Sequence, residues 1–299
     1  MLRETYRCAA VVLAAAAVLA GCGGSKEDSG LAKTFSYDSS QPLDFKSRAT
    51  PLGGQGVEVR DISFTGPTGT RLNGYLASPS SSVKHPGVIY AHGAGGNRSE
   101  MLDQAIAMAH RGAVGLTLDM SYSPDRAAPL PAGMAGVRAR AQTEVDAVRE
   151  IRRSVDLLRS LSFVDGDQLG YVGWSAGARM GAVAAGVEHR IRAFDLIAGG
   201  ATPVSEYVNL APEELRSELR TELGKTDPLR YVGHASPSAL LFQDGRADEI
   251  VPQPALKLLA KTGSDPKDIR WYDSGHTPSS KAWTDSREWL AEHLGLTSS

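Results

Sequence analysis

Short runs of apolar residues recur from the middle of the chain onward, and helical stretches separate them. The runs cover residues 87–91, 113–118, 169–172, 191–197 and 239–242. A continuous apolar strand is typical of a parallel sheet that is buried on both faces, and alternation with helices is typical of crossover connections. The pattern therefore predicts an α/β fold with a mostly parallel central sheet and helices on both faces.

Residues 137–158 form the clearest predicted helix, because apolar residues recur there at steps of three and four. They are Val137, Ala141, Val145, Val148, Ile151, Val155 and Leu158. A last strand is predicted at residues 269–272 and a closing helix at about residues 279–293. Upstream, residues 57–64 and 71–77 alternate apolar and polar side chains around a Gly-Pro-Thr-Gly turn. These two segments predict two antiparallel strands at the N-terminal edge of the sheet.

The segment at residues 201–225 interrupts the alternation of strands and helices. It is acidic and helical in character, and Ala-Pro-Glu-Glu provides a helix start. A small cap and a surface crossover both fit this segment. Apart from it, no second domain and no internal repeat is apparent.

The first residues differ in character from the rest of the chain. Arg3 and Arg7 precede an uninterrupted apolar run at residues 8–20. A membrane-spanning helix needs about 20 apolar residues, so this run is too short to span comfortably. It also lacks the polar face of a buried amphipathic helix. The run is typical of the hydrophobic region of a signal peptide.

Residues 19–22, Leu-Ala-Gly-Cys, resemble a bacterial lipobox. The resemblance implies that residues 1–21 are removed as a lipoprotein signal peptide. It also implies that Cys22 carries lipid, which would anchor the protein to the bacterial cell membrane outside the cytoplasm. Of the two cysteines in the chain, the other lies within the removed segment, so no internal disulfide can form. Residues 22–54 are rich in small and polar residues and predict a flexible linker before one domain at residues 55–299.

Composition and charge narrow the functional classes. Of the 299 residues, 41% are hydrophobic and 22% are charged, which are the proportions of a water-soluble globular protein. The formal net charge is −2, and no block of lysine or arginine stands out beyond the predicted helices. We therefore expect no nucleic-acid partner.

Residues 173–177, Gly-Trp-Ser-Ala-Gly, lie between the predicted strand at 169–172 and a helical stretch at 178–187. The pentapeptide alone is weak evidence, because glycine and serine are frequent in this chain. At a junction of strand and helix, however, each residue of the pentapeptide has a structural role. The two glycines remove Cβ atoms that would collide there, and the serine hydroxyl is exposed on a sharp turn. Ser175 is therefore a candidate nucleophile.

Three further motifs follow predicted strands. Residues 92–96 read His-Gly-Ala-Gly-Gly, residues 245–252 include Asp248, and residues 274–276 read Ser-Gly-His. With the serine turn, these motifs make residues 57–294 resemble the α/β-hydrolase superfamily. Within it, the resemblance is to the small esterases and the dienelactone-hydrolase-like members.

The resemblance implies a catalytic triad and an oxyanion hole. Ser175 would be the nucleophile, Asp248 the acid and His276 the base. The backbone amides of Ala94 and Ala176 would bind the developing negative oxygen.

Some residues near these motifs compete for a role. Asp244 and Glu249 are rival carboxylates, and the motif position favours Asp248. Residues 121–136 are rich in proline and alanine, and we expect them near the site. Within them, Tyr122 could line the acyl pocket, although a surface-loop tyrosine is the commoner case. The remaining candidate histidines lie on predicted surface loops or helices without a motif; they are His85, His110, His189, His234 and His293.

These residues together predict a serine hydrolase that cleaves a small-molecule carboxylic ester through an acyl-enzyme. No cofactor is implied. Neither the cysteines nor any pair of histidines with i, i+4 spacing offers a metal site. A peptidase or amidase of the same fold is an alternative, because the same triad serves both reactions. A non-catalytic binding lipoprotein is a second alternative, because a fold does not determine a function.

Overall fold

The computed structural model describes residues 30–81 and 83–296. The predicted signal peptide at residues 1–21 and the predicted lipidation site Cys22 lie outside the described residues. Among the residues that are described, no helix has both the length and the apolar character that crossing a membrane requires.

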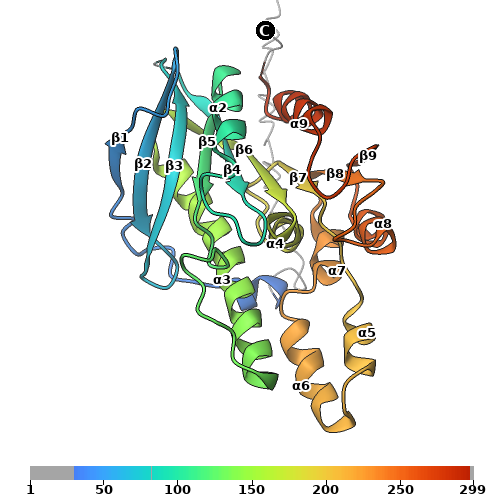
Figure 1. Ribbon diagram of the computed structural model, residues 1–299. Helices are drawn as coiled ribbons and strands as arrows, with labels where there is room; N and C mark the ends of the chain where they lie inside the picture. Colours follow the sequence, from blue (N-terminus) through green and yellow to red (C-terminus); the bar gives the residue numbers. More distant parts are fainter. Residues whose placement is uncertain (1–29, 82, 297–299) are drawn as a thin grey trace, which may run out of the picture.

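A nine-stranded sheet forms the centre of the molecule, in the order β1-β2-β3-β5-β4-β6-β7-β8-β9 (Figure 1). The strands are β1 (Lys46–Ala49), β2 (Val57–Thr65), β3 (Arg71–Pro79), β4 (His85–Ala91), β5 (Val114–Leu118), β6 (Val164–Trp174), β7 (Ala193–Ile197), β8 (Ala239–Gly245) and β9 (Lys267–Tyr272). Strands β4 to β9 pair in parallel, whereas β1, β2 and β3 form an antiparallel edge that joins β5. The mostly parallel sheet confirms the fold class that the apolar runs predicted.

Helices cover both faces of this sheet. They are α2 (Leu102–His110), α3 (Gly133–Ser160), α4 (Ala176–Ala185), α5 (Val204–Asn209), α6 (Glu213–Leu223), α7 (Pro228–Tyr231), α8 (Gln253–Thr262) and α9 (Ser280–His293), with the 3-10 turns η1 (Lys33–Phe35) and η2 (Val232–His234). Successive strand residues point to opposite faces. Ile89 packs in the cluster that contains α3 and α4, whereas its neighbours Val88 and Tyr90 pack in the cluster that contains α2 and α9. Both faces are therefore apolar, which explains the uninterrupted apolar runs.

The segment at residues 201–225 forms α5 and α6 between β7 and α7 (Figure 1). Helix α6 contacts α3, and an ion pair joins Glu218 of α6 to Arg138 of α3. The segment is therefore a helical insertion that follows the carboxyl end of β7, the edge at which β6 also ends.

The structure differs from the predicted linker at residues 22–54 in the part that is described. Phe35 is completely buried, and its ring lies edge-on to that of Tyr231, with 5.5 Å between ring centroids. Strand β1 pairs with β2 and adds a third antiparallel strand to the two that were predicted. We call residues 33–45 the N-terminal strap. Its apolar residues are isolated in the sequence and show no period, so composition alone indicated a spacer.

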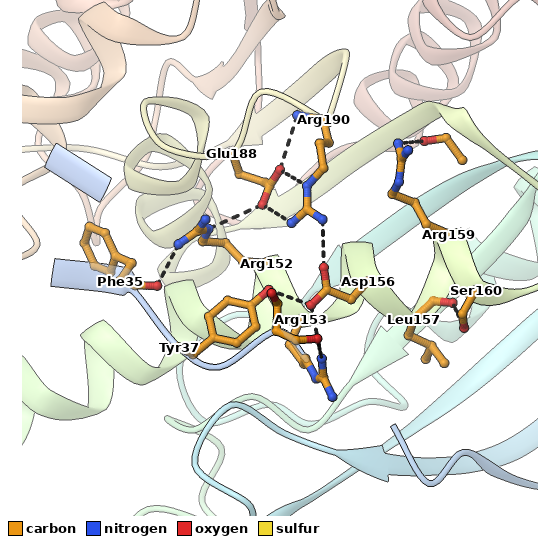
Figure 2. A network of polar contacts seen from close by, with 12 residues as sticks. Phe35, Tyr37, Arg152, Arg153, Asp156, Leu157, Arg159, Ser160, Glu188 and Arg190 are labelled. Carbon is orange, nitrogen blue, oxygen red and sulfur yellow. Dashed lines mark hydrogen bonds and ion pairs between the residues drawn. The ribbon is translucent and has the colours of Figure 1, made fainter. Parts of the chain in front are cut away.

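Polar contacts hold the N-terminal strap against α3. The hydroxyl of Tyr37 donates to Asp156 at 2.7 Å, and Arg152 donates to the carbonyl oxygen of Phe35 at 2.7 Å (Figure 2). Arg153, whose side chain is 1% exposed, donates to two further carbonyl oxygens of the strap. A buried guanidinium needs such acceptors, because an unpaired buried charge is strongly destabilising. The strap is thus part of the folded domain.

Phe35→Ala is expected to lower the free energy of unfolding by about 3 kcal/mol, because it deletes a buried ring and leaves a cavity. Urea unfolding monitored by circular dichroism measures the change. Leu52→Ala is the matched control, since Leu52 lies in the same predicted linker with 47% of its surface exposed. The control should change stability by less than about 0.5 kcal/mol. Equal stability of both variants and the wild type would show that the strap does not pack.

Candidate active site

Ser175 lies on a sharp turn between β6 and α4. Its backbone φ of 55° and ψ of −111° lie outside the regions that residues with a side chain prefer. A Cβ atom on Gly173 would lie 2.5 Å from the carbonyl carbon of Gly177. A Cβ atom on Gly177 would lie 2.3 Å from the carbonyl oxygen of Ala91. Close packing of the backbone therefore requires both glycines of the Gly-x-Ser-x-Gly turn.

The structure brings Ser175, His276 and Asp248 together at the carboxyl edge of the sheet. Nε2 of His276 lies 2.9 Å from Oγ of Ser175, and Nδ1 lies 2.9 Å from Oδ2 of Asp248. The other carboxylate oxygen of Asp248 accepts hydrogen bonds from the amides of Ile250 at 2.9 Å and Val251 at 2.8 Å. With Nδ1 donating to the carboxylate, Nε2 is the nitrogen that can accept the serine proton.

The two rival carboxylates have different surroundings. Asp244 is the penultimate residue of β8 and is 3% exposed, and burial, followed by the charge of Asp248, raises its pKa to about 7. Glu249 lies beside Gly275: a Cβ atom on Gly275 would lie 2.9 Å from Oε2 of Glu249. Within the described chain, the hydrogen-bonded carboxylate partner of His276 is Asp248.

Ala94 and Ala176 line one pocket of about 330 Å³ beside the serine turn. Ala176 is the first residue of α4, so its amide has no acceptor within the helix. In the described part of the chain, neither this amide nor that of Ala94 donates to another protein group. The positive end of the α4 dipole also favours negative charge at this point. The two amides are therefore available to an anionic oxygen.

His92 fixes the loop that carries Ala94. Its Nδ1 donates to the carbonyl oxygen of Gly93 at 2.7 Å, and its Nε2 accepts from the amide of Met120 at 3.2 Å. Burial lowers the pKa of His92, so the ring is neutral at pH 7. The hydroxyl of Tyr122 donates to the carbonyl oxygen of His92 at 2.9 Å. The loop is thus tied to the segment that follows β5.

The segment at residues 121–136, which the sequence analysis expected near the site, forms one wall of the pocket. It contributes Tyr122, Ala127, Ala128 and Leu130. Tyr122 therefore differs from the surface-loop position that was favoured for it, because its ring packs on that of His92 with 5.0 Å between centroids.

Three charged pocket residues were missed by the sequence reasoning: Arg140, Glu144 and Arg179. Glu144 accepts from Nε of Arg140 at 3.2 Å and from the hydroxyl of Thr226 at 2.5 Å, and it lies 3.7 Å from Nη2 of Arg179. The same three residues also line a second cavity of about 240 Å³, which reaches α5 and α6. Arg179 lies in the first turn of α4, where its amide donates to the carbonyl oxygen of Ser175 at 3.0 Å. Nothing in the sequence linked the two residues of α3 to the site.

The other histidines lie away from this arrangement. His85, expected on a surface loop, is buried at the start of β4, where its ring contacts the hydroxyl of Ser81 and the carbonyl oxygen of Gly112. Across residues 30–81 and 83–296, no group of three or more His, Cys, Asp or Glu side chains is arranged to hold a metal ion.

Solved structures share the architecture of this chain. Acetyl xylan esterase 1 from Thermoanaerobacterium sp. superposes with a TM-score of 0.75 at 19% identity, over 91% of this chain and 93% of that one. For an acetyl xylan esterase from Paenibacillus sp., the TM-score is 0.71 at 19% identity, over 89% of this chain and 92% of that one. A cold-adapted esterase from an Arctic intertidal metagenomic library gives 0.63 at 16% identity, over 84% and 100%. At these identities, the likeness shows the fold alone.

Sequence comparison finds a family model that matches part of the chain. No curated protein matches the chain significantly. Residues 72–214 match the model of the dienelactone hydrolase family, and this range includes the serine turn and the loop at residues 92–96. Residues 72–214 therefore match a dienelactone hydrolase family domain, and the described chain has the fold of the α/β-hydrolase-type esterases.

Proposed function

We propose that this protein is a serine hydrolase that cleaves carboxylic esters through a covalent acyl-enzyme. The observation that carries the proposal is the hydrogen-bonded chain from Asp248 through His276 to Ser175, whose hydroxyl stands on a strained turn. Triads of this kind are recognised by geometry and roles rather than by sequence position. The family domain supports a hydrolytic reaction.

In the first half of the reaction, His276 takes the proton of the Ser175 hydroxyl as Oγ attacks the acyl carbon. Asp248 holds the imidazole in the required tautomer and stabilises the positive charge that forms on it. The carbon–oxygen bond to the alcohol then breaks, and His276 returns the proton to the departing alcohol. In the second half, water attacks the acyl-enzyme with His276 again as the base, and the carboxylic acid leaves Ser175.

The amides of Ala94 and Ala176 stabilise both tetrahedral intermediates. Each preorganised donor of this kind typically contributes about 10²- to 10³-fold to the rate. An ester rather than an amide is the favoured substrate, because three structures that share the fold are named as esterases.

Ser175→Ala should abolish hydrolysis of p-nitrophenyl acetate, with a loss of at least roughly 10⁴-fold, because no nucleophile is left. It should also abolish covalent labelling by a fluorophosphonate probe. Circular dichroism checks that the fold is intact. Labelling of the variant at the wild-type rate would contradict the assignment of Ser175. If the wild-type protein cleaves peptides in preference to esters, it is a peptidase rather than an esterase.

We assign the pocket of about 330 Å³ to the acyl group of the substrate, since Ala94 and Ala176, the two residues of the proposed oxyanion hole, line it. Its apolar lining comes from Ala127, Ala128, Leu130 and Met180. At one wall, Glu144 and the two arginines separate it from the second cavity. An acyl chain could pass this wall only by separating the charges, which is costly in a partly buried site. The pocket therefore favours short and medium acyl groups.

Glu144→Ala should raise kcat/KM for p-nitrophenyl octanoate relative to the butyrate by about tenfold, because the added methylenes could then enter the second cavity. A series of esters from acetyl to decanoyl measures the shift. Asp146→Ala is the matched control, since Asp146 also lies on α3 and pairs with Arg149 at 3.2 Å outside both cavities. An unchanged chain-length profile in Glu144→Ala, or an equal shift in the control, would contradict the assignment of the wall.

We also propose that lipid on Cys22 anchors the protein to the membrane, with the hydrolase domain outside the cytoplasm. The signal-peptide pattern and the lipobox-like residues 19–22 support this. Cys22→Ser should move the protein from the membrane fraction to the soluble fraction on ultracentrifugation of cell lysates. The outcome that contradicts the proposal is a variant that stays in the membrane fraction to the same extent as the wild type.

A further inference from the structure

Trp174 lies beside the nucleophile, and its indole contacts two other segments of the site, the loop of His276 and the loop of Gly93. Trp174 is the last residue of β6 and directly precedes Ser175. Its Nε1 donates a hydrogen bond to the backbone carbonyl oxygen of His276 at 3.1 Å. Its ring centroid lies 5.8 Å from that of the His276 imidazole. One side chain therefore joins the strand that carries the nucleophile to the loop that carries the base.

The same indole supports the oxyanion loop. A Cβ atom on Gly93 would lie 3.3 Å from Cε3 of Trp174 and 3.6 Å from Cβ of Ser175. The backbone next to Ala94 thus rests directly on the ring. The ring cannot move without changing the surroundings of this loop, because protein interiors are closely packed.

The loop at residues 273–279, between β9 and α9, has few other attachments. Within the described chain, two hydrogen bonds hold its backbone to other segments. One runs from the amide of Ala247 to the carbonyl oxygen of Ser274 at 3.0 Å, and the other comes from Trp174. The Trp174 bond is the one made at His276 itself. It restrains the backbone of the residue whose imidazole must stay aligned with the Ser175 hydroxyl.

We propose that Trp174 is a positioning residue that holds the imidazole of His276 and the oxyanion loop in register with Ser175. This inference rests on the proposed function. The indole is suited to the task because it combines a large flat ring with one N–H donor at its edge. A phenylalanine would supply most of the ring but no donor. If Trp174 only filled space, a phenylalanine would serve nearly as well.

Trp174→Phe should lower kcat for p-nitrophenyl acetate by about tenfold or more, because small errors in alignment are costly for a proton transfer between fixed groups. KM should stay within about twofold of the wild type, since the pocket that we assign to the acyl group does not include Trp174. The rate of fluorophosphonate labelling should fall together with kcat. Steady-state kinetics and thermal unfolding of the same preparations measure these effects.

Trp289→Phe is the matched control. Trp289 of α9 is 2% exposed, and its indole N–H donates to Asp268 at 2.8 Å. The control therefore loses the same kind of hydrogen bond away from the site. It should lower the melting temperature at least as much as Trp174→Phe and leave kcat unchanged. A kcat of Trp174→Phe within twofold of the wild type, or an equal fall of kcat in both variants, would overturn the proposal.

Gly93→Ala provides a second test that leaves the indole in place. Its new methyl group would press on the ring, so kcat should fall at least a few-fold with KM preserved. This variant decides the matter if Trp174→Phe does not fold, and a wild-type kcat would then overturn the proposal. Ser175→Ala separates the two levels of inference. If Ser175→Ala is fully active, the proposed function fails, and the positioning role of Trp174 fails with it. If Ser175→Ala is inactive while Trp174→Phe and Gly93→Ala match the wild type, only the positioning role fails.

Discussion

The hydrogen bond between the Ser175 hydroxyl and Nε2 of His276 is the contact on which the rest of the site depends. It joins residues that are 101 positions apart in the chain, and β7 and β8 lie between their strands in the sheet. The two groups meet only because both strands end at the same edge and each loop bends toward the other. Close packing on both faces of the sheet sets the separation that the loops must bridge.

The backbone of Ser175 is strained, and the residues packed around it hold it in this conformation. The left-handed backbone of Ser175 is costly by itself, and surrounding structure must hold it in place. Close backbone contacts at Gly173 and Gly177 fix the position of the serine turn. The buried neutral ring of His92 holds the loop of Ala94, and the indole of Trp174 lies between that loop and His276. The site therefore depends on a shell of side chains that take no part in the chemistry.

Hydrophobic patterns in the sequence predicted the parallel strands best, because these strands are buried on both faces of the sheet and are therefore apolar at nearly every position. Each predicted apolar run overlaps one strand. Strand β6, however, begins at Val164, five residues before its apolar run, because residues 165–168 are Asp-Gly-Asp-Gln and break the apolar pattern. Periodicity predicted nothing at the N-terminal strap, where the single ring of Phe35 is buried against Tyr231 almost 200 residues later. An isolated apolar residue carries no period, so its partner cannot be found from neighbouring positions.

By itself, the sequence determined the alternation of strands and helices after β3, the two antiparallel strands β2 and β3, the serine turn and the candidate positions Ser175, Asp248 and His276. Those features depend on residue spacing and on motifs that follow strand ends. Only the tertiary structure decided the distances within the triad, the packing of the N-terminal strap and the polar wall at Glu144. Each of these joins elements that are distant along the chain. Their contacts arise from how several helices and strands pack together, and no short stretch of sequence contains that information.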